Sequence, residues 1–375
     1  MDIKELMKMR LFTVLTVAFI CGCSKSDDGP AAPPEQTDME KVDDLVYRYM
    51  SQHAVPGATL AVSKDGKLVY AKAYGFADRE TAERMTTDTR SRISSISKSV
   101  TAIAIMKLYE AGKLGLDDKI FGTDGILGDD FGSVRPYRSY ITDLTVKHCL
   151  SHHVGGWGNT SNDPTGMRNE LDAPQLISYI IDNVPLSSPP GTSYAYSNVG
   201  FMILGRVIEK ISQKPYEQFV KDEILEPLGI TSMEIGGNTL SDRKPNESRY
   251  HQASAYTQNF ARRDANGGWI ATATDLTRLF VHVDGFPSVP DILQSSTIQT
   301  MTSPPFSHTG YALGFMVQGS TWYHGGSFSG SRSHFVRTGT GMIAAILVNN
   351  NATQLDALLN NIINAPVTWP DNDLF

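Results

Sequence analysis

The chain has little cysteine and no excess of positive charge. Its 375 residues include 3 cysteines, and 33 Lys and Arg stand against 40 Asp and Glu, which gives a net charge of −7. Without a basic patch, nothing in the sequence indicates nucleic-acid binding. If Cys21 and Cys23 belong to a leader and its anchor, Cys149 is the only thiol left and no intrachain disulfide can form. Stability must then come from a large hydrophobic core, which a chain of this length can supply.

The N-terminal end carries the pattern of an export signal. Basic residues precede the apolar run Leu11–Gly22, which is too short to span a bilayer but has the length of a signal-peptide core. The stretch that ends at Cys23 resembles a bacterial lipobox. We therefore predict a lipoprotein signal peptide over residues 1–22, a lipid on Cys23 and a flexible tether over residues 23–37. The protein is expected at the bacterial cell envelope, on its periplasmic or surface face, with a cleaved soluble signal as the alternative.

Motifs for metal binding are also scarce. His148, His152 and His153 lie close together, but no cysteine or carboxylate stands at a metal-ligand spacing beside them, and no His-Glu-x-x-His occurs. We interpret these histidines as structural, and Cys149 as a buried helix residue rather than a nucleophile. The sequence thus predicts chemistry without a metal or an organic cofactor.

What the chain does contain is a serine and a lysine three residues apart. Ser95 and Lys98 precede Val100–Leu108, which is apolar nearly all round, as in a helix buried inside a domain. Residues three apart lie on one face of a helix, so both side chains can reach the same cleft. A lysine can take the serine proton only if burial or nearby cations keep it partly neutral. The pair predicts a covalent serine hydrolase that uses lysine in place of a histidine triad.

A second Ser-x-x-Lys competes with the first. Ser241–Lys244 lies in a polar stretch beside Pro245 and Asn246, a pattern typical of a surface loop. We therefore predict that Ser95, and not Ser241, is the nucleophile.

A tyrosine and an asparagine form the second motif, Tyr196-Ser197-Asn198. It follows a Pro-Pro-Gly turn and precedes a helical pattern, which places it on a loop ahead of a helix. A phenol whose pKa is lowered by a nearby lysine can pass protons between nucleophile and leaving group, and a carboxamide can hold a substrate carbonyl. We expect Tyr196 to be catalytic and Asn198 to bind substrate.

The third motif is a His-x-Gly, with matches at His153, His308 and His324. We favour His324, because the sequence around it predicts strands, and keep His308 as the runner-up. An edge strand that carries Gly325 and Gly326 would let a substrate lie against its backbone. The N–H groups of Ser95 and Ser327 could then form an oxyanion hole.

The order Ser-x-x-Lys, Tyr-x-Asn, His-x-Gly resembles the class C β-lactamase-like branch of the penicillin-recognising serine hydrolases. The resemblance runs from about Asp38 to Val348. Further segments that carry it are Val55–Ala58, Gly112–Leu114, Leu116–Asp118, Leu144–Val146, Leu150–His152, Pro227–Ile230, Gly267–Gly268 and Thr274–Leu276. This branch contains β-lactamases, D-alanyl-D-alanine carboxypeptidases, D-aminopeptidases and carboxylesterases.

The resemblance implies a role for each motif residue. Ser95 would be acylated, Lys98 would be its base partner, Tyr196 would shuttle protons, and His324 would replace the lysine of a Lys-Thr-Gly motif that this chain lacks. Gly325 stands where the threonine hydroxyl would bind a substrate carboxylate, which counts against an efficient β-lactamase. We consider that Arg332 could supply the missing positive charge, with a solvated turn arginine as the alternative.

The pattern of elements predicts an α/β (α+β) fold of the β-lactamase/DD-peptidase kind, with an antiparallel sheet formed by both terminal segments, flanking helices and an inserted helical lobe. Predicted strands are 57–63, 67–74, 311–317, 321–323, 335–337 and 342–348; predicted helices are 38–52, 95–111, 145–152, 173–182, 199–212, 216–225 and 353–363. We expect one catalytic domain over residues 38–365, its sheet lobe at about 38–92 and 265–365 and its helical lobe at about 93–264.

The sequence thus predicts an exported, lipid-anchored serine hydrolase that acts on an ester or an amide, including D-amino-acid peptides. A weak β-lactamase or D-alanyl-D-alanine carboxypeptidase is the alternative, and a non-catalytic protein that binds cell-wall peptides is the alternative of another class. The long polar segment Gly155–Pro190 is expected to form a binding wall, with Trp157 and Trp269 as candidate pocket aromatics. Either tryptophan could instead belong to the core. Whether Lys98 or Tyr196 is the acylation base stays open at this point.

Overall fold

The computed structural model describes residues 39–160, 163–306 and 310–375. The predicted signal peptide, the predicted lipid site at Cys23, the tether and the runner-up His308 lie outside these residues. Within the described ranges, no helix has the length and apolar character needed to cross a membrane.

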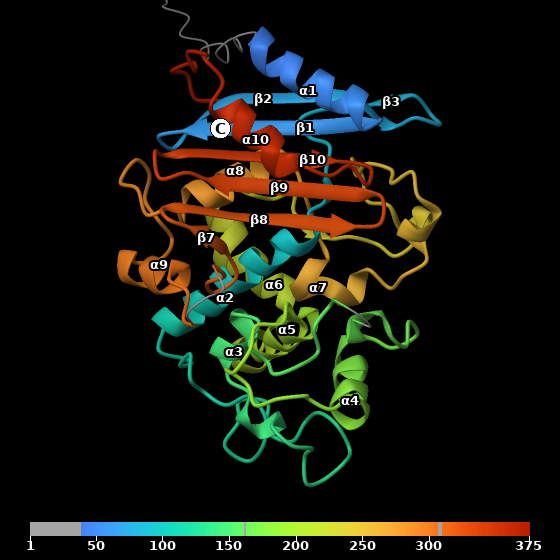
Figure 1. Ribbon diagram of the computed structural model, residues 1–375, viewed down its shortest axis with the longest axis vertical. Helices are drawn as coiled ribbons and strands as arrows, with labels where there is room; N and C mark the ends of the chain where they lie inside the picture. Colours follow the sequence, from blue (N-terminus) through green and yellow to red (C-terminus); the bar gives the residue numbers. More distant parts are fainter. Residues whose placement is uncertain (1–38, 161–162, 307–309) are drawn as a thin grey trace, which may run out of the picture. The chain divides into compact units, whose positions relative to one another are not determined.

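A seven-stranded antiparallel sheet joins the two ends of the chain, in the order β3-β2-β1-β10-β9-β8-β7 (Figure 1). β1 (Gly57–Lys64) pairs with β10 (Met342–Val348) along its length, and Ala58 stands opposite Val348. The other strands are β2 (Lys67–Asp78), β3 (Glu83–Arg84), β7 (Met316–Gln318), β8 (Thr321–Phe328) and β9 (Ser331–Arg337). The predicted sheet of N- and C-terminal segments is confirmed.

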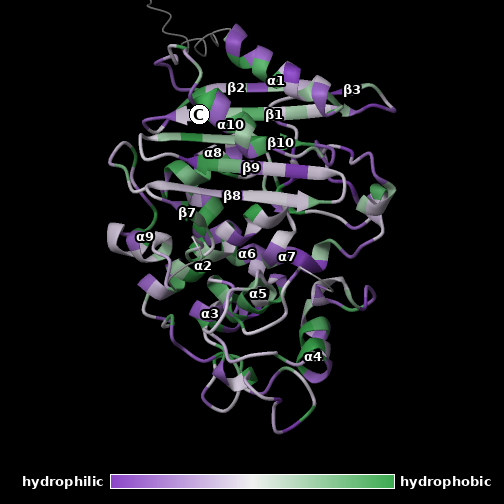
Figure 2. Ribbon diagram, viewed as in Figure 1, coloured by the Kyte–Doolittle hydropathy of each residue, from purple (hydrophilic) through white to green (hydrophobic). Residues whose placement is uncertain are grey.

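Helices cover both faces of this sheet. α1 (Glu40–Gln52) and α10 (Leu355–Ile363) lie on one face, here called the outer face, and α8 (Ala273–Val281) packs on β1 and β10 from the other, the inner face (Figure 1). Hydrophilic and hydrophobic residues alternate along α1 (Figure 2), because only Val42, Val46 and their neighbours on one stripe face the strands. The outer face therefore has its own apolar core, separate from the larger core on the inner side.

The helical lobe adjoins the inner face. Its elements are α2 (Ser97–Glu110), α3 (Val146–Leu150), α4 (Ala173–Asn183), α5 (Asn198–Ser212), α6 (Tyr216–Val220), α7 (Asp264–Gly267), α9 (Ser295–Thr302) and a small sheet of β4 (Ser91–Arg92), β6 (Trp269–Ala271) and β5 (Glu234–Ile235). α2 is buried along almost its whole length, from Ser97 to Leu108. Its apolar residues on all sides made this burial predictable.

Two strand predictions around the site are wrong in their bounds. Residues 311–315 form a tight turn instead of a strand, because Gly314 adopts a φ of 84° that turns the chain. Only Met316–Gln318 remains extended, as β7. The strand predicted over residues 321–323 is longer, since β8 continues as far as Phe328.

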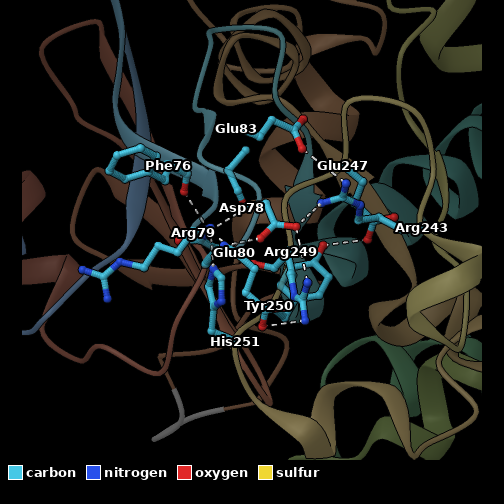
Figure 3. Close-up of polar contacts among 12 residues, drawn as sticks. Phe76, Asp78, Arg79, Glu80, Glu83, Arg243, Glu247, Arg249, Tyr250 and His251 are labelled. Carbon is cyan, nitrogen blue, oxygen red and sulfur yellow. Dashed lines mark hydrogen bonds and ion pairs between the residues drawn. The ribbon is translucent and has the colours of Figure 1, made fainter.

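Ion pairs fix the chain segment that runs back from the helical lobe to β2 and β3 (Figure 3). The buried Asp78 carboxylate lies 3.6 Å from Arg243 and 3.5 Å from Arg249. Arg243 also reaches Glu83 at 3.3 Å, and Arg249 reaches Glu80 at 2.7 Å. Burial alone would raise the pKa of Asp78, but the Glu80 backbone N–H and the Arg249 guanidinium lower it further than burial raises it. The carboxylate therefore stays charged and holds the segment in place.

The competing Ser-x-x-Lys belongs to this fixed surface segment. Ser241 is exposed, and Lys244 lies 3.4 Å from the carboxylate of Glu234. The second Ser-x-x-Lys therefore lies in an ion-paired segment at the protein surface, as its polar sequence predicted.

Candidate active site

Ser95 lies in a short 3₁₀ turn, Ser94–Ile96, that leads directly into α2. Its side chain is half-buried, and the preceding Ser94 has a φ of 49°, in the left-handed region that non-glycine residues rarely adopt. Strained backbone of this kind persists where the surrounding structure holds it, and it often marks functional sites. The turn leaves the Ser95 hydroxyl accessible at the start of a buried helix.

Lys98 lies one turn further along and is completely buried. Its Nζ is 3.2 Å from Oγ of Ser95 and donates a hydrogen bond of 2.6 Å to the carbonyl of Asn266. Burial lowers the pKa of Lys98 from 10.5 to about 7, Asp163 opposes this by raising the pKa, and Arg263 adds to the decrease. At neutral pH the amine is therefore neutral about half of the time, which is what a proton acceptor for Ser95 needs.

Tyr196 lies beside this pair, with Nζ of Lys98 at 5.0 Å from its ring centre. Burial raises the pKa of Tyr196, and Ser95 only partly offsets this effect. The expected decrease of this pKa by the lysine is wrong for the free site, because burial raises the pKa of the phenol more than its neighbours lower it. The phenol is accordingly a proton donor in the resting site, while the lysine is the base.

His152 packs against the loop that carries Tyr196. The imidazole is fully buried, its Nδ1 accepts a hydrogen bond of 3.0 Å from the N–H of Ser197, and its ring lies 4.0 Å from that of Tyr196. Burial lowers the pKa of His152 well below its ordinary value, and the Lys98 charge acts in the same direction. A neutral histidine therefore positions Tyr196 without competing for protons.

His324 faces the same site from β8 and is 2% exposed. Its Nδ1 lies 2.7 Å from the carbonyl of Gly325, which can only accept, so the proton is on Nδ1. Nε2 then accepts from the hydroxyl of Tyr311 at 3.0 Å. Burial lowers the pKa of His324 to about 3, with a further contribution from Lys98. The histidine is thus a neutral group in the site, and it does not restore the positive charge of the missing lysine.

The two glycines after His324 face opposite sides of β8. A Cβ on Gly326 would come within 2.1 Å of the Ile93 carbonyl and 2.0 Å of the Ser333 hydroxyl, so only glycine lets the Ser95 turn lie against the strand. A Cβ on Gly325 would lie 3.3 Å from the His334 ring and 3.8 Å from the Ser333 carbonyl, with no closer contact. The absence of a side chain at Gly326 therefore lets the turn that carries Ser95 pack directly against β8.

Beyond Tyr323, β8 has no partner on the site side within the described residues, because β7 pairs only with Thr321–Tyr323. The predicted edge strand thus exists over His324–Phe328. Ser327 lies on this edge and is exposed.

Asn198 is the first residue of α5, and its contact was not predicted. Its Nδ2 donates a hydrogen bond of 2.6 Å to the carboxylate of Asp163. The other oxygen of Asp163 accepts from the N–H of Thr165 at 3.0 Å. Asp163 lies in the long polar segment that we expected to form a binding wall, but nothing in the sequence distinguishes it from the other polar residues there.

Three candidate substrate-binding residues are not brought to the site. Nη1 of Arg332 donates to the carbonyls of Phe328 and Ser331 and so holds the β8–β9 turn. Trp157 is buried, and its indole donates to the carbonyl of Val184. Trp269 is completely buried and donates to the hydroxyl of Tyr216. The tryptophans are core residues, because each indole N–H finds its partner inside the helical lobe.

Histidine and cysteine side chains elsewhere in the lobe have structural contacts. His148 forms a reciprocal cap with Thr145 at the start of α3, and Nδ1 of His153 lies 2.8 Å from the carbonyl of Ser151. Cys149 is fully buried, as predicted, and burial raises the pKa of its thiol. Across the ranges that the structure describes, no group of three or more His, Cys, Asp or Glu could hold a metal ion.

Comparisons with known proteins agree with this geometry. The beta-lactamase family profile matches residues 42–366. "Penicillin-binding protein 4" of Amycolatopsis lactamdurans is 28% identical over 322 residues, which cover 80% of this chain and 82% of that protein. The octameric penicillin-binding protein homologue from Pyrococcus abyssi has a TM-score of 0.71 at 25% identity, covering 87% of this chain and 77% of that one. A D-stereospecific amidohydrolase from Streptomyces has a TM-score of 0.70 at 22% identity, covering 88% and 100%, which shows a shared fold.

The family match spans most of the chain and includes the serine, lysine, tyrosine and histidine that the fold gathers at one edge of the sheet. The chain belongs to the beta-lactamase family of serine hydrolases and penicillin-binding proteins.

Proposed function

We propose that the protein is a hydrolase that forms an acyl-enzyme on Ser95 and then hydrolyses it. The observation that carries this proposal is the distance of 3.2 Å between Oγ of Ser95 and Nζ of a completely buried Lys98. A pKa of about 7 makes that lysine a usable base at neutral pH. A non-catalytic binding protein would have no use for a buried, half-neutral lysine, so we favour the enzyme.

Each proton has a stated path in the proposed reaction. Neutral Lys98 accepts the Ser95 proton as Oγ bonds to the substrate carbonyl carbon, and the N–H groups of Ser95 and Ser327 would stabilise the oxyanion. The bond to the leaving nitrogen or oxygen then breaks as Tyr196 protonates it, and Lys98 reprotonates Tyr196. Water next attacks the acyl carbon and gives its proton to Lys98, which is neutral again at this stage, and that proton returns to Oγ as the acid leaves.

We propose an amide or ester substrate, with D-aminoacyl amides and peptides ahead of β-lactams. His324 is neutral and Arg332 is committed to a turn, so neither of them supplies the cation that the missing lysine would offer a β-lactam carboxylate. The similarity in fold to a D-stereospecific amidohydrolase supports the same order of preference. A lipid anchor on Cys23 at the cell envelope stays part of the proposal.

Intact-protein mass spectrometry after incubation with a fluorophosphonate tests the nucleophile. We expect one covalent adduct in the wild type, the same adduct in Ser241→Ala, and none in Ser95→Ala. Parallel incubation with a p-nitrophenyl ester and a penicillin should release p-nitrophenol faster than it opens the β-lactam. Folded wild-type protein without adduct or turnover would instead favour the binding protein.

A further inference from the structure

The site contains a carboxylate that is not paired with a cation. Both oxygens of the half-buried Asp163 accept hydrogen bonds from neutral donors, the Asn198 amide and the Thr165 N–H. No Lys, Arg or His of the described residues forms an ion pair with it. Asp163 nevertheless acts on both catalytic groups, because its charge raises the pKa values of Lys98 and Tyr196. A partly desolvated anion next to reacting groups has an unmet preference for a cation.

The contact with Asp163 determines which hydrogen-bonding groups Asn198 can offer a ligand. One N–H of its carboxamide is committed to Asp163, so what the pair offers a ligand is the carboxamide oxygen and the remaining lone pairs of the carboxylate. Such a group of acceptors fits a donor that is rich in N–H and positively charged. It fits poorly the carbonyl of an N-acylated amine, which needs a donor and would meet a negative charge.

We propose that Asp163 and the carboxamide oxygen of Asn198 bind the free α-ammonium group of the substrate, one carbon away from the carbonyl that Ser95 attacks. This inference rests on the proposed function and narrows it to an aminopeptidase or aminoacyl amidase. It separates this chain from hydrolases whose substrates are acylated at that nitrogen, as penicillins are.

Arg263 supports a competing interpretation. Its guanidinium is half-buried, donates to Thr165 and Gln258 and lies 5.6 Å from the centre of the Phe328 ring, at the end of the β8 edge. A carboxylate on the acyl half of a substrate could reach it. We favour Asp163, because it contacts Asn198 of the Tyr-x-Asn motif directly, whereas the guanidinium of Arg263 already donates to Thr165 and Gln258.

Three substrates with one leaving group distinguish these interpretations: D-phenylalanine p-nitroanilide and its N-acetyl and N-succinyl derivatives. Comparing kcat/KM at pH 6.5, below the ordinary α-amino pKa of about 7.7–8.0, keeps the free amine protonated. All three substrates have the same leaving group. A change in the catalytic efficiency of Lys98 or Tyr196 therefore affects them equally and cancels in the ratio of two kcat/KM values. We expect the wild type to prefer the free amine over the N-acetyl compound by about tenfold or more, the value of one charge-assisted contact.

The variant Asp163→Asn should reduce that ratio by about tenfold, to near 1. Asp172→Asn is the matched control, because Asp172 is an exposed aspartate that caps α4 and does not act on Lys98; its ratio should equal that of the wild type. A wild-type ratio of 1 or less, or a ratio unchanged in Asp163→Asn, overturns the inference, as does preference for the N-succinyl compound, which would favour Arg263. If Asp163→Asn does not fold, the three wild-type values decide. Loss of the Ser95 adduct would be a separate result, against the proposed function itself.

Discussion

The two faces of the main sheet each bury a charged side chain, with opposite consequences. On the outer face, the Asp43 carboxylate of α1 accepts hydrogen bonds from Lys72 at 2.6 Å, Tyr70 at 2.7 Å and Tyr74 at 2.8 Å. Burial acts to raise the pKa of Asp43, but these contacts outweigh it and the pKa is lowered. On the inner side, Lys98 of α2 has only neutral hydrogen-bond partners, and burial moves its pKa down to about 7.

Burial alone therefore does not make a catalytic group. A buried charge with a close counter-ion stays ionised and contributes structure, whereas one without it moves toward its neutral form. The negative charge that acts on Lys98 is that of Asp163, which is hydrogen-bonded elsewhere and only partly restores the pKa. The two buried groups thus differ in their hydrogen-bond partners, which include a cation at Asp43 and are neutral at Lys98.

The largest effect is expected for Lys98→Ala. Without the base, the rate of acylation of Ser95 by a p-nitrophenyl ester should fall by about 10³-fold, within the usual range for general-base catalysis. Stopped-flow measurement of the first turnover reads this rate directly. Lys72→Ala, which removes the lysine of the outer face, should leave the rate within about twofold and lower only the stability. Equal losses in both variants would mean that Lys98 acts through folding.

Gly326→Ala should reduce kcat/KM by about 10²-fold, because the new Cβ would push the Ser95 turn away from β8. Gly325→Ala is the matched control on the outer side of the same strand. Its Cβ would come no closer than 3.3 Å to any atom outside its neighbours, so we expect a change of about threefold or less. Steady-state kinetics with one ester substrate compares the two. A larger loss in Gly325→Ala would show that β8 is oriented differently.

Asp43→Asn should lower the free energy of unfolding by about 2 kcal/mol at pH 7, the scale of hydrogen bonds to a charged group, while kcat stays unchanged. Since the folded-state pKa of Asp43 is lowered, its contribution is present above the unfolded value of 3.8 and is lost as the pH falls through the folded value. Urea unfolding at several pH values should show the gap between wild type and variant closing below pH 4. A gap that stays constant down to pH 2 would exclude the charge as its cause.

The sequence was sufficient for the long elements of the fold. Runs such as 57–63 and 342–348 have the apolar character of buried strands, and residues 100–108 are apolar on nearly every side, so their burial needed no further information. The short elements β3, β4, β5, β6 and α7 were not predicted, and neither were the longer helices α8 and α9. Elements of two to four residues have no period to detect, and tertiary contacts decide them. The 311–315 turn was missed because the φ of Gly314 depends on α2 beside it.

The site was predictable where a motif joins residues close in sequence. Ser95, Lys98, Tyr196 and His324 do meet, and their spacing pointed to them. What the sequence did not contain is the environment: His152 under the tyrosine, Tyr311 on His324, and Asp163 on Asn198. Each of these contacts joins residues from different segments, so no local pattern reveals them. The same reason explains why the direction of the pKa shift of Tyr196 was expected incorrectly.

The most direct test of the account is the pH dependence of Ser95 acylation by a neutral ester under single-turnover conditions. Since the pKa of Lys98 is lowered to about 7, its neutral form increases as the pH rises through that value. We predict a rate that increases about tenfold per pH unit below pH 7 and levels off above it. His324, whose pKa is about 3, should add no second step between pH 5 and pH 9. A rate that is flat over this range, or that still rises at pH 10, would contradict a buried, half-neutral lysine as the base.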